Sequence, residues 1–136
     1  MSFAAAVRTC FQKYATFEGR AKRSEFWWLM LFQTLVTGVV ALIGGVFLIA
    51  ASAGSPGGQA NGPLLVIGII LYFLAIVVAL ALLVPTYAVG CRRLHDRGMS
   101  GWLQLLTLVP CGNIALLVLW VMGGTPGANT YGEKTS

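Results

Sequence analysis

The sequence predicts an all-α integral membrane protein with three membrane segments and an N-terminal amphipathic helix. Hydrophobic residues make up 57% of its 136 residues and charged residues only 10%, whereas soluble domains carry about 25% charged residues. No Asp, Glu, Lys, Arg or His lies between Phe26 and Cys91. That stretch holds two apolar runs, each longer than the roughly 20 residues that an α-helix needs to cross the hydrocarbon core of a bilayer. The pattern predicts a single membrane domain that covers residues 1–136.

The segment at residues 1–25 predicts a short amphipathic helix on the cytoplasmic side, ahead of the first span. Phe3, Val7, Phe11 and Tyr14 recur at spacings of three and four residues, which is helical periodicity. Basic residues occupy other positions around this helix. It could therefore lie flat in the membrane interface, or pack on a cytoplasmic loop of its own chain.

Two predicted spans, residues 26–51 and 64–90, are joined by an external loop at 52–63. In the first span, small or hydrogen-bonding side chains recur every four residues. Helices in lipid associate through close backbone approach, so this stripe predicts a helix-packing face. The predicted packing face consists of Gln33, Thr37, Ala41 and Gly45.

The third apolar stretch, residues 102–122, is broken between Pro110 and Asn113. One arrangement is a kinked helix that crosses the bilayer and leaves the tail at 123–136 outside. The other is a pair of half-helices that dip into the bilayer and return. Irregular backbone is tolerated at membrane depth where protein buries it or where it lines a watery cavity, so both arrangements are physically admissible. We favour the broken crossing, and the side of the C-terminus stays open.

The net charge of +5 is concentrated in two segments that flank the spans. Positive charge is retained on the cytoplasmic side of membranes, so the N-terminus and the basic loop at 91–101 are predicted to be cytoplasmic. This rule accounts for the charge, and we expect no binding of nucleic acid. We expect the charged residues to form internal ion pairs first, and a site for anionic lipid headgroups or a protein partner second. The predicted cluster consists of Arg20, Lys22, Arg23, Glu25, Arg92, Arg93, His95, Asp96 and Arg97.

No residue pattern in the sequence points to an enzyme. His95 is the only histidine and Asp96 the only aspartate, and no serine near them resembles an activated nucleophile. The three cysteines lack the spacing of a metal site or of a disulfide framework. We therefore expect no catalytic residue, no metal and no cofactor.

The sequence leaves two classes of function open. The favoured class is a non-enzymatic membrane component that binds lipid headgroups or a protein partner, which could be another membrane protein or a second copy of the chain. The alternative is an oligomeric small-solute transporter or channel subunit. Transport sites usually need an ionisable group within the bilayer or broken helices. The two long spans contain no ionisable group of this kind, and the break in residues 102–122 is a faint sign of a broken helix.

Three motifs, in order along the chain, carry a resemblance to a known family. They are residues 17–28 (FEGRAKRSEFWW), 92–102 (RRLHDRGMSGW) and 124–132 (GTPGANTYG). Together they resemble the YhaH-type bacterial inner-membrane proteins, catalogued as domain of unknown function 805. The resemblance implies a multi-pass protein of the bacterial inner membrane with no established molecular activity, so no catalytic residue is transferred. It also suggests that the first two motifs form one cytoplasmic site, with Arg20, Glu25, Arg93, His95 and Asp96 as members.

Overall fold

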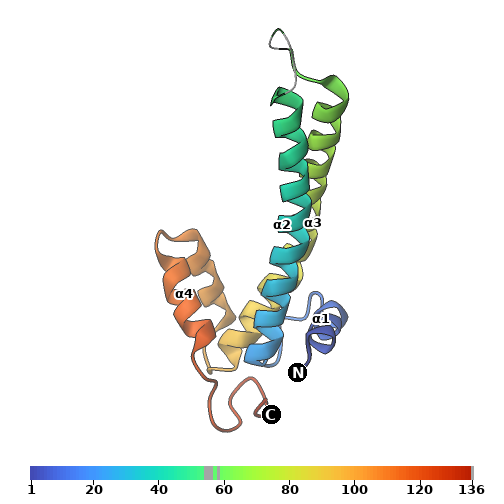
Figure 1. Ribbon diagram of the computed structural model, residues 1–136. Coiled ribbons are helices and arrows are strands. Elements are labelled where there is room, and N and C mark those ends of the chain that lie inside the picture. Colours follow the sequence, from blue (N-terminus) through green and yellow to red (C-terminus); the bar gives the residue numbers. More distant parts are fainter. Residues whose placement is uncertain (54–56, 58, 136) are drawn as a thin grey trace. The chain divides into compact units, whose positions relative to one another are not determined.

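The computed structural model describes residues 1–53, 57 and 59–135, and within them the regular secondary structure is helical (Figure 1). The predicted all-α class is confirmed. Part of the loop predicted at 52–63 lies outside the described residues. The helices are α1 (Phe3–Gln12), α2 (Arg23–Ala53), α3 (Gly62–His95), the 3₁₀ helix η1 (Gly101–Leu108) and α4 (Gly112–Val121).

The chain divides into two units that differ sharply in charge. One unit is Leu31–Leu82, and the other combines Met1–Met30 with Leu83–Ser136. Every charged residue of the sequence falls in the second unit. We call the second unit the charged unit, and we call Leu31–Leu82 the apolar unit.

The helices α2 and α3 are long and apolar enough to cross a membrane, with 31 and 34 residues and with mean hydropathies of 2.4 and 3.1 in their most apolar 18-residue windows. Only 11% of the most apolar window of each helix is buried. The core helix of a soluble protein would instead be mostly buried. Large apolar side chains such as Leu42, Ile49 and Phe73 are 65% to 69% exposed, as lipid-facing residues are.

In the apolar unit, the two helices run side by side and come into close contact at two glycines (Figure 1). A Cβ atom added to Gly44 would lie 3.1 Å from the backbone nitrogen of Tyr72 and 3.3 Å from the carbonyl oxygen of Gly68. A Cβ atom added to Gly68 would in turn lie 2.8 Å from Cγ of Leu48. Small residues therefore permit the close backbone contact that association in lipid requires.

The close contact at Gly44 differs from the predicted packing face at its last member. Gln33, Thr37, Ala41 and Gly45 are all half-buried, but a Cβ atom on Gly45 would have no neighbouring atom within 4 Å. In an α-helix of 3.6 residues per turn, residues four positions apart are offset by about 40° around the helix axis. A stripe with this spacing therefore drifts away from the partner helix. A stripe that begins at Gln33 has therefore left the contact by Gly45, and Gly44 takes its place.

In the charged unit, α1 packs on the first turns of α2. The side chains of Ala6 and Cys10 are buried, and the Cys10 thiol lies 4.0 Å from the carbonyl oxygen of Glu25. The ring of Phe3 meets Trp28 edge to face, with 5.6 Å between the ring centroids. The helix therefore packs on its own chain, and its support is α2 rather than the expected loop.

The third apolar stretch forms a hairpin in which η1 and α4 lie side by side (Figure 1). The two helices have 8 and 10 residues, each far fewer than the roughly 20 residues of a span. The turn between them uses Cys111 with a left-handed φ of 64°. A Cβ atom on Gly112 would lie 1.9 Å from the carbonyl oxygen of Leu106, so only glycine permits the return at this point.

The hairpin brings the chain back to its starting point. η1 begins five residues after Asp96, and beyond α4 the N–H of Thr125 donates a hydrogen bond to the carbonyl oxygen of the same Asp96 at 2.9 Å. Our preference for a broken crossing was therefore wrong, whereas the break itself is present. The two short halves pair with each other, so the segment returns.

Candidate functional site

The second motif forms the end of α3, where Gly98 terminates the helix. Gly98 has a left-handed φ of 73° and donates to the carbonyl oxygen of His95 at 2.9 Å, while Met99 donates to that of Leu94 at 3.0 Å. These two bonds make a Schellman motif, in which glycine is favoured because it lacks a Cβ atom. The geometry fixes the residues just before Gly98 in place.

The third motif, in the tail, lies directly on this helix end. Besides the bond from Thr125 to Asp96, the Asn129 side-chain amide donates to the carbonyl oxygen of His95 at 2.9 Å. A Cβ atom on Gly124 would lie 2.0 Å from Oδ2 of Asp96, so a larger residue has no room there. The tail therefore satisfies carbonyl groups that the end of α3 leaves without helical partners.

Asp96 is the centre of a buried ion-pair network. Its side chain accepts a hydrogen bond from Nε of Arg20 at 2.8 Å and another from Nη1 of Arg93. The hydroxyl of Thr135 donates to the same carboxylate at 3.0 Å. All three charged side chains are at most 4% exposed, so the charges are removed from water and each depends on its partners.

Arg20 uses its remaining donors on backbone carbonyl groups of the tail and of Asp96. Nη1 donates to Gly127 at 2.8 Å and to Gly132 at 3.3 Å. Nη2 donates to Thr125 at 3.1 Å and to Asp96 at 3.2 Å. The planar guanidinium group carries five N–H donors, and here it joins the first motif to the other two.

Arginines also hold the C-terminal end of α4. Nε of Arg93 donates to the carbonyl oxygen of Trp120 at 3.1 Å, and its Nη2 donates to that of Met122. Nη1 of Arg23 lies 3.4 Å from the carbonyl oxygen of Val121. Cations at this position satisfy the last carbonyl groups of a helix and interact favourably with its dipole.

A second buried ion pair joins Glu25 to Arg92, with 2.6 Å between Oε1 and Nη1. Nε and Nη2 of Arg92 have no hydrogen-bond partner in the described part of the chain. The Cys10 thiol lies 3.9 Å from Oε1 of Glu25. Burial, and then the negative charge of Glu25, raise the pKa of Cys10 to about 11, so the thiol stays protonated and unreactive at neutral pH.

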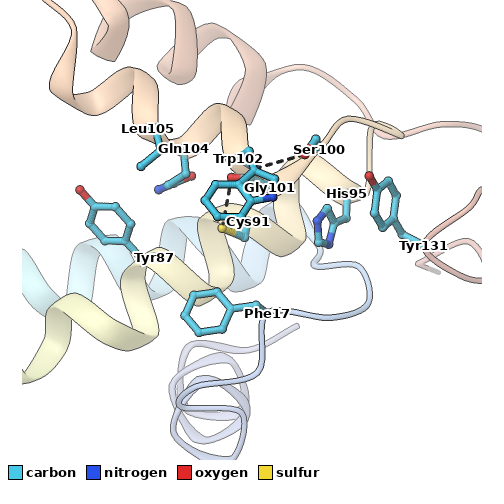
Figure 2. A pocket seen from close by; sticks show the side chains of 10 residues that line it. All are labelled: Phe17, Tyr87, Cys91, His95, Ser100, Gly101, Trp102, Gln104, Leu105 and Tyr131. Atoms are coloured by element: carbon cyan, nitrogen blue, oxygen red, sulfur yellow. Dashed lines mark hydrogen bonds between the residues drawn. The ribbon is translucent and has the colours of Figure 1, made fainter.

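His95 takes no part in either ion pair. Its ring stacks on that of Tyr131 with centroids 4.0 Å apart and planes inclined by only 2°, as Figure 2 shows. Nδ1 lies 3.2 Å from the carbonyl oxygen of Gly19. Of the five predicted members of one joined site, the structure thus brings Arg20, Arg93 and Asp96 together, places Glu25 with Arg92, and sets His95 apart.

Basic side chains that the networks do not use surround a pocket of about 460 Å³ in the charged unit. We call it the basic pocket, and the cations on its wall that lack a carboxylate partner among the described residues are Lys22, Arg23 and Lys134. None of these three forms a salt bridge with any described residue. The remaining member of the predicted cluster, Arg97, is not among its lining residues. Nothing in the sequence pointed to the contribution of Lys134.

A larger cavity of about 590 Å³ (Figure 2) is lined by residues of the charged unit, and it shares no lining residue with the basic pocket. We call it the apolar cavity. It was not predicted, because its walls come from four separate segments of the chain. Its lining residues are Phe17, Tyr87, Cys91, His95, Ser100, Gly101, Trp102, Gln104, Leu105 and Tyr131.

No group of three histidine, cysteine or acidic side chains that could hold a metal ion occurs among the described residues. The arrangement offers ion pairs, a basic pocket and an apolar cavity. Nothing in it resembles a nucleophile activated by a neighbouring base.

These features define a small helical membrane protein whose charges are confined to one unit. The chain belongs to the family described as "Protein of unknown function (DUF805)", whose model matches residues 14–133. It is 33% identical over 123 residues to inner membrane protein YhaI of Escherichia coli K12, which covers 90% of this chain and 87% of that protein. It is 34% identical over 122 residues to inner membrane protein YhaH of the same strain, with 89% and 88% covered. No solved structure matches significantly. The predicted family and the predicted class of transmembrane inner-membrane protein are both confirmed.

Proposed function

We propose that this protein is a non-enzymatic component of the bacterial inner membrane whose charged unit faces the cytoplasm and binds the phosphate headgroups of anionic lipids. The observation that carries the proposal is the basic pocket. Arg20, Arg92 and Arg93 are occupied by internal carboxylates and carbonyl groups. Lys22 and Lys134 remain for an external anion, and Arg23, which contacts the carbonyl oxygen of Val121, has no carboxylate partner in the described chain either.

The chemistry of the pocket suits a phosphate group. Its one acidic lining residue, Asp96, is already neutralised by two arginines. The hydroxyl of Ser24 adds a hydrogen-bond donor beside the cations. Basic residues close to a membrane surface gain about 1 kcal/mol each from anionic lipids, and a phosphate can accept several charge-assisted hydrogen bonds.

The orientation follows from the positive charge, which favours the cytoplasmic side. Because the hairpin returns to the charged unit, both ends of the chain belong on that side. A fluorescent reporter that matures only in the cytoplasm, fused after the tail, should therefore be bright. A dark fusion with normal protein abundance would contradict this topology.

Native mass spectrometry from nanodiscs tests the lipid site. We expect phosphatidylglycerol to remain bound to the unaltered protein in preference to phosphatidylcholine. The variant Lys22→Gln/Lys134→Gln should lose this preference several-fold, since it removes two cations and leaves every ion pair intact. The matched control, Arg8→Gln/Lys13→Gln, removes two exposed charges from the region of α1.

Equal losses in the two variants would mean that net charge alone attracts lipid, and no loss in either would exclude the basic pocket. Solute flux through proteoliposomes would instead favour the alternative, an oligomeric transporter or channel subunit. A binding component should leave gradients across the proteoliposome membrane intact.

A further inference from the structure

The apolar cavity is a second site, distinct from the basic pocket in position and chemistry. Its volume of about 590 Å³ lies within the range of small-molecule sites. Figure 2 shows Tyr87, Cys91 and His95 on α3 facing Gln104 and Leu105 on η1, with Phe17 on a further side. Most of the wall is aromatic or aliphatic.

Three side chains of the wall offer hydrogen-bond acceptors. Gln104 is only 5% exposed, and its Oε1 has no partner in the described structure. Thr107 donates its single hydroxyl hydrogen to the backbone oxygen of Gln104 at 3.0 Å. The Tyr87 hydroxyl, 3.1 Å from Thr107, must then be the donor of that pair, and its own lone pairs remain acceptors.

The third acceptor is His95. The carbonyl oxygen of Gly19, 3.2 Å from Nδ1, can only accept, so Nδ1 carries the hydrogen. In the neutral ring Nε2 is then an acceptor. It is turned toward Gly101, since a Cβ atom built there would lie 3.0 Å away. A ligand should therefore bring a hydrogen-bond donor.

No Asp, Glu, Lys or Arg is among the residues that line the cavity. A charged ligand would lose its hydration without gaining a counter-charge, which strongly disfavours it. Trp102 and Leu105, which line the cavity, are 80% and 52% exposed, so part of its wall is an apolar surface. We propose that the cavity binds an uncharged apolar molecule that carries a hydroxyl group and enters from the membrane.

A hydroxyl group also suits the Gln104 amide in either orientation. The oxygen and nitrogen of such an amide are assigned from their hydrogen bonds. A hydroxyl can donate to the oxygen or accept from the nitrogen, so it satisfies the buried side chain both ways. A methyl ether of the same shape can only accept.

Photolabelling tests the proposal in phosphatidylcholine nanodiscs. The probe is a long-chain alcohol with a diazirine beside the hydroxyl, and the matched probe is its methyl ether. We expect the alcohol to label peptides of the cavity wall several-fold more than the ether. Gln104→Leu should lower labelling by the alcohol and leave labelling by the ether unchanged, so the ratio between the two probes should fall.

A blocking variant keeps the proposal falsifiable if Gln104→Leu fails to fold. Leu105→Trp places a larger side chain at a half-exposed lining position and should abolish labelling of the wall. Leu108→Trp, on the same 3₁₀ helix, is 79% exposed and is not a lining residue, so labelling should persist. Equal labelling by the two probes, or labelling that survives Leu105→Trp, would mean that ordinary lipid or water fills the cavity and would overturn the proposal.

Discussion

Asp96 and Arg20, separated by 76 positions in the sequence, form a buried ion pair with 2.8 Å between Oδ1 and Nε. The pair ties the coil before α2 to the end of α3. Because the other carboxylate oxygen binds Arg93, one acidic side chain holds two guanidinium groups in place. This dependence makes Asp96 the most sensitive charged position in the protein.

Asp96→Asn should destabilise the protein strongly. The change leaves two buried cations without a counter-charge, and breaking a buried pair in this way costs about 3–5 kcal/mol. The melting temperature in detergent should fall accordingly. Glu133→Gln is the control, since Glu133 is exposed and forms no ion pair with the described residues. Equal melting temperatures for Asp96→Asn and the unaltered protein would contradict the network.

Gly124→Ala should detach the tail from the end of α3. Its Cβ atom would lie 2.0 Å from Oδ2 of Asp96, a distance that requires the backbone to move. We expect faster proteolysis within residues 123–135 and a lower melting temperature. Gly127→Ala offers a matched comparison, because nothing lies within 4 Å of the added atom. Similar proteolysis of the two variants would show that the tail is not packed as described.

Gly44→Val should disturb the contact between α2 and α3, whereas Gly45→Val should not. A Cβ atom at Gly44 meets the backbone of α3 at 3.1 Å to 3.3 Å, and one at Gly45 meets nothing within 4 Å. Overpacking of this kind costs typically 1–3 kcal/mol. Thermal unfolding of both variants in the same detergent measures the difference. The reverse order of stabilities would restore Gly45 to the packing face.

We expect the free energy of unfolding to decrease with rising pH in the alkaline range, in part because of Cys10. Its pKa is raised from 9.0 to about 11 in the folded state, so the unfolded chain loses this proton first. The contribution of Cys10 is full below about pH 9, and the free energy of unfolding then decreases as the pH rises toward the folded pKa. Cys10→Ala should flatten this part of the profile. Cys111→Ala, at an exposed position, should leave its slope unchanged.

The sequence was sufficient for the helices because their signal is strong and local. A segment without charges that is longer than a bilayer is thick can hardly form anything except spans. The scarcity of acidic residues also limited the choice of partners for the arginines. Glu25 and Asp96 stood out as partners for this reason, although the specific pairing with Arg92 and with Arg20 did not.

The contacts of the tail, the direction of the hairpin and the two pockets could not be predicted in full, because they depend on groups that no sequence pattern marks. Arg20 and Arg93 bind backbone carbonyl groups, which every residue possesses, so no side chain marked the tail as their partner. The direction of the hairpin depended on contacts of Gly112 that only three-dimensional structure reveals. The apolar cavity and the contribution of Lys134 to the basic pocket escaped prediction for a related reason, since both bring together segments that are distant in sequence.

The binding of Arg20 by the tail constrains the order of events during biosynthesis. Arg20 leaves the ribosome 112 residues ahead of Gly132, whose carbonyl oxygen it later binds. Until Gly132 has been synthesised, this guanidinium group lacks one of its native acceptors and must remain hydrated or bind another group. Closure of this part of the charged unit therefore waits for the tail, and synthesis that stops before Gly132 would leave Arg20 incompletely satisfied.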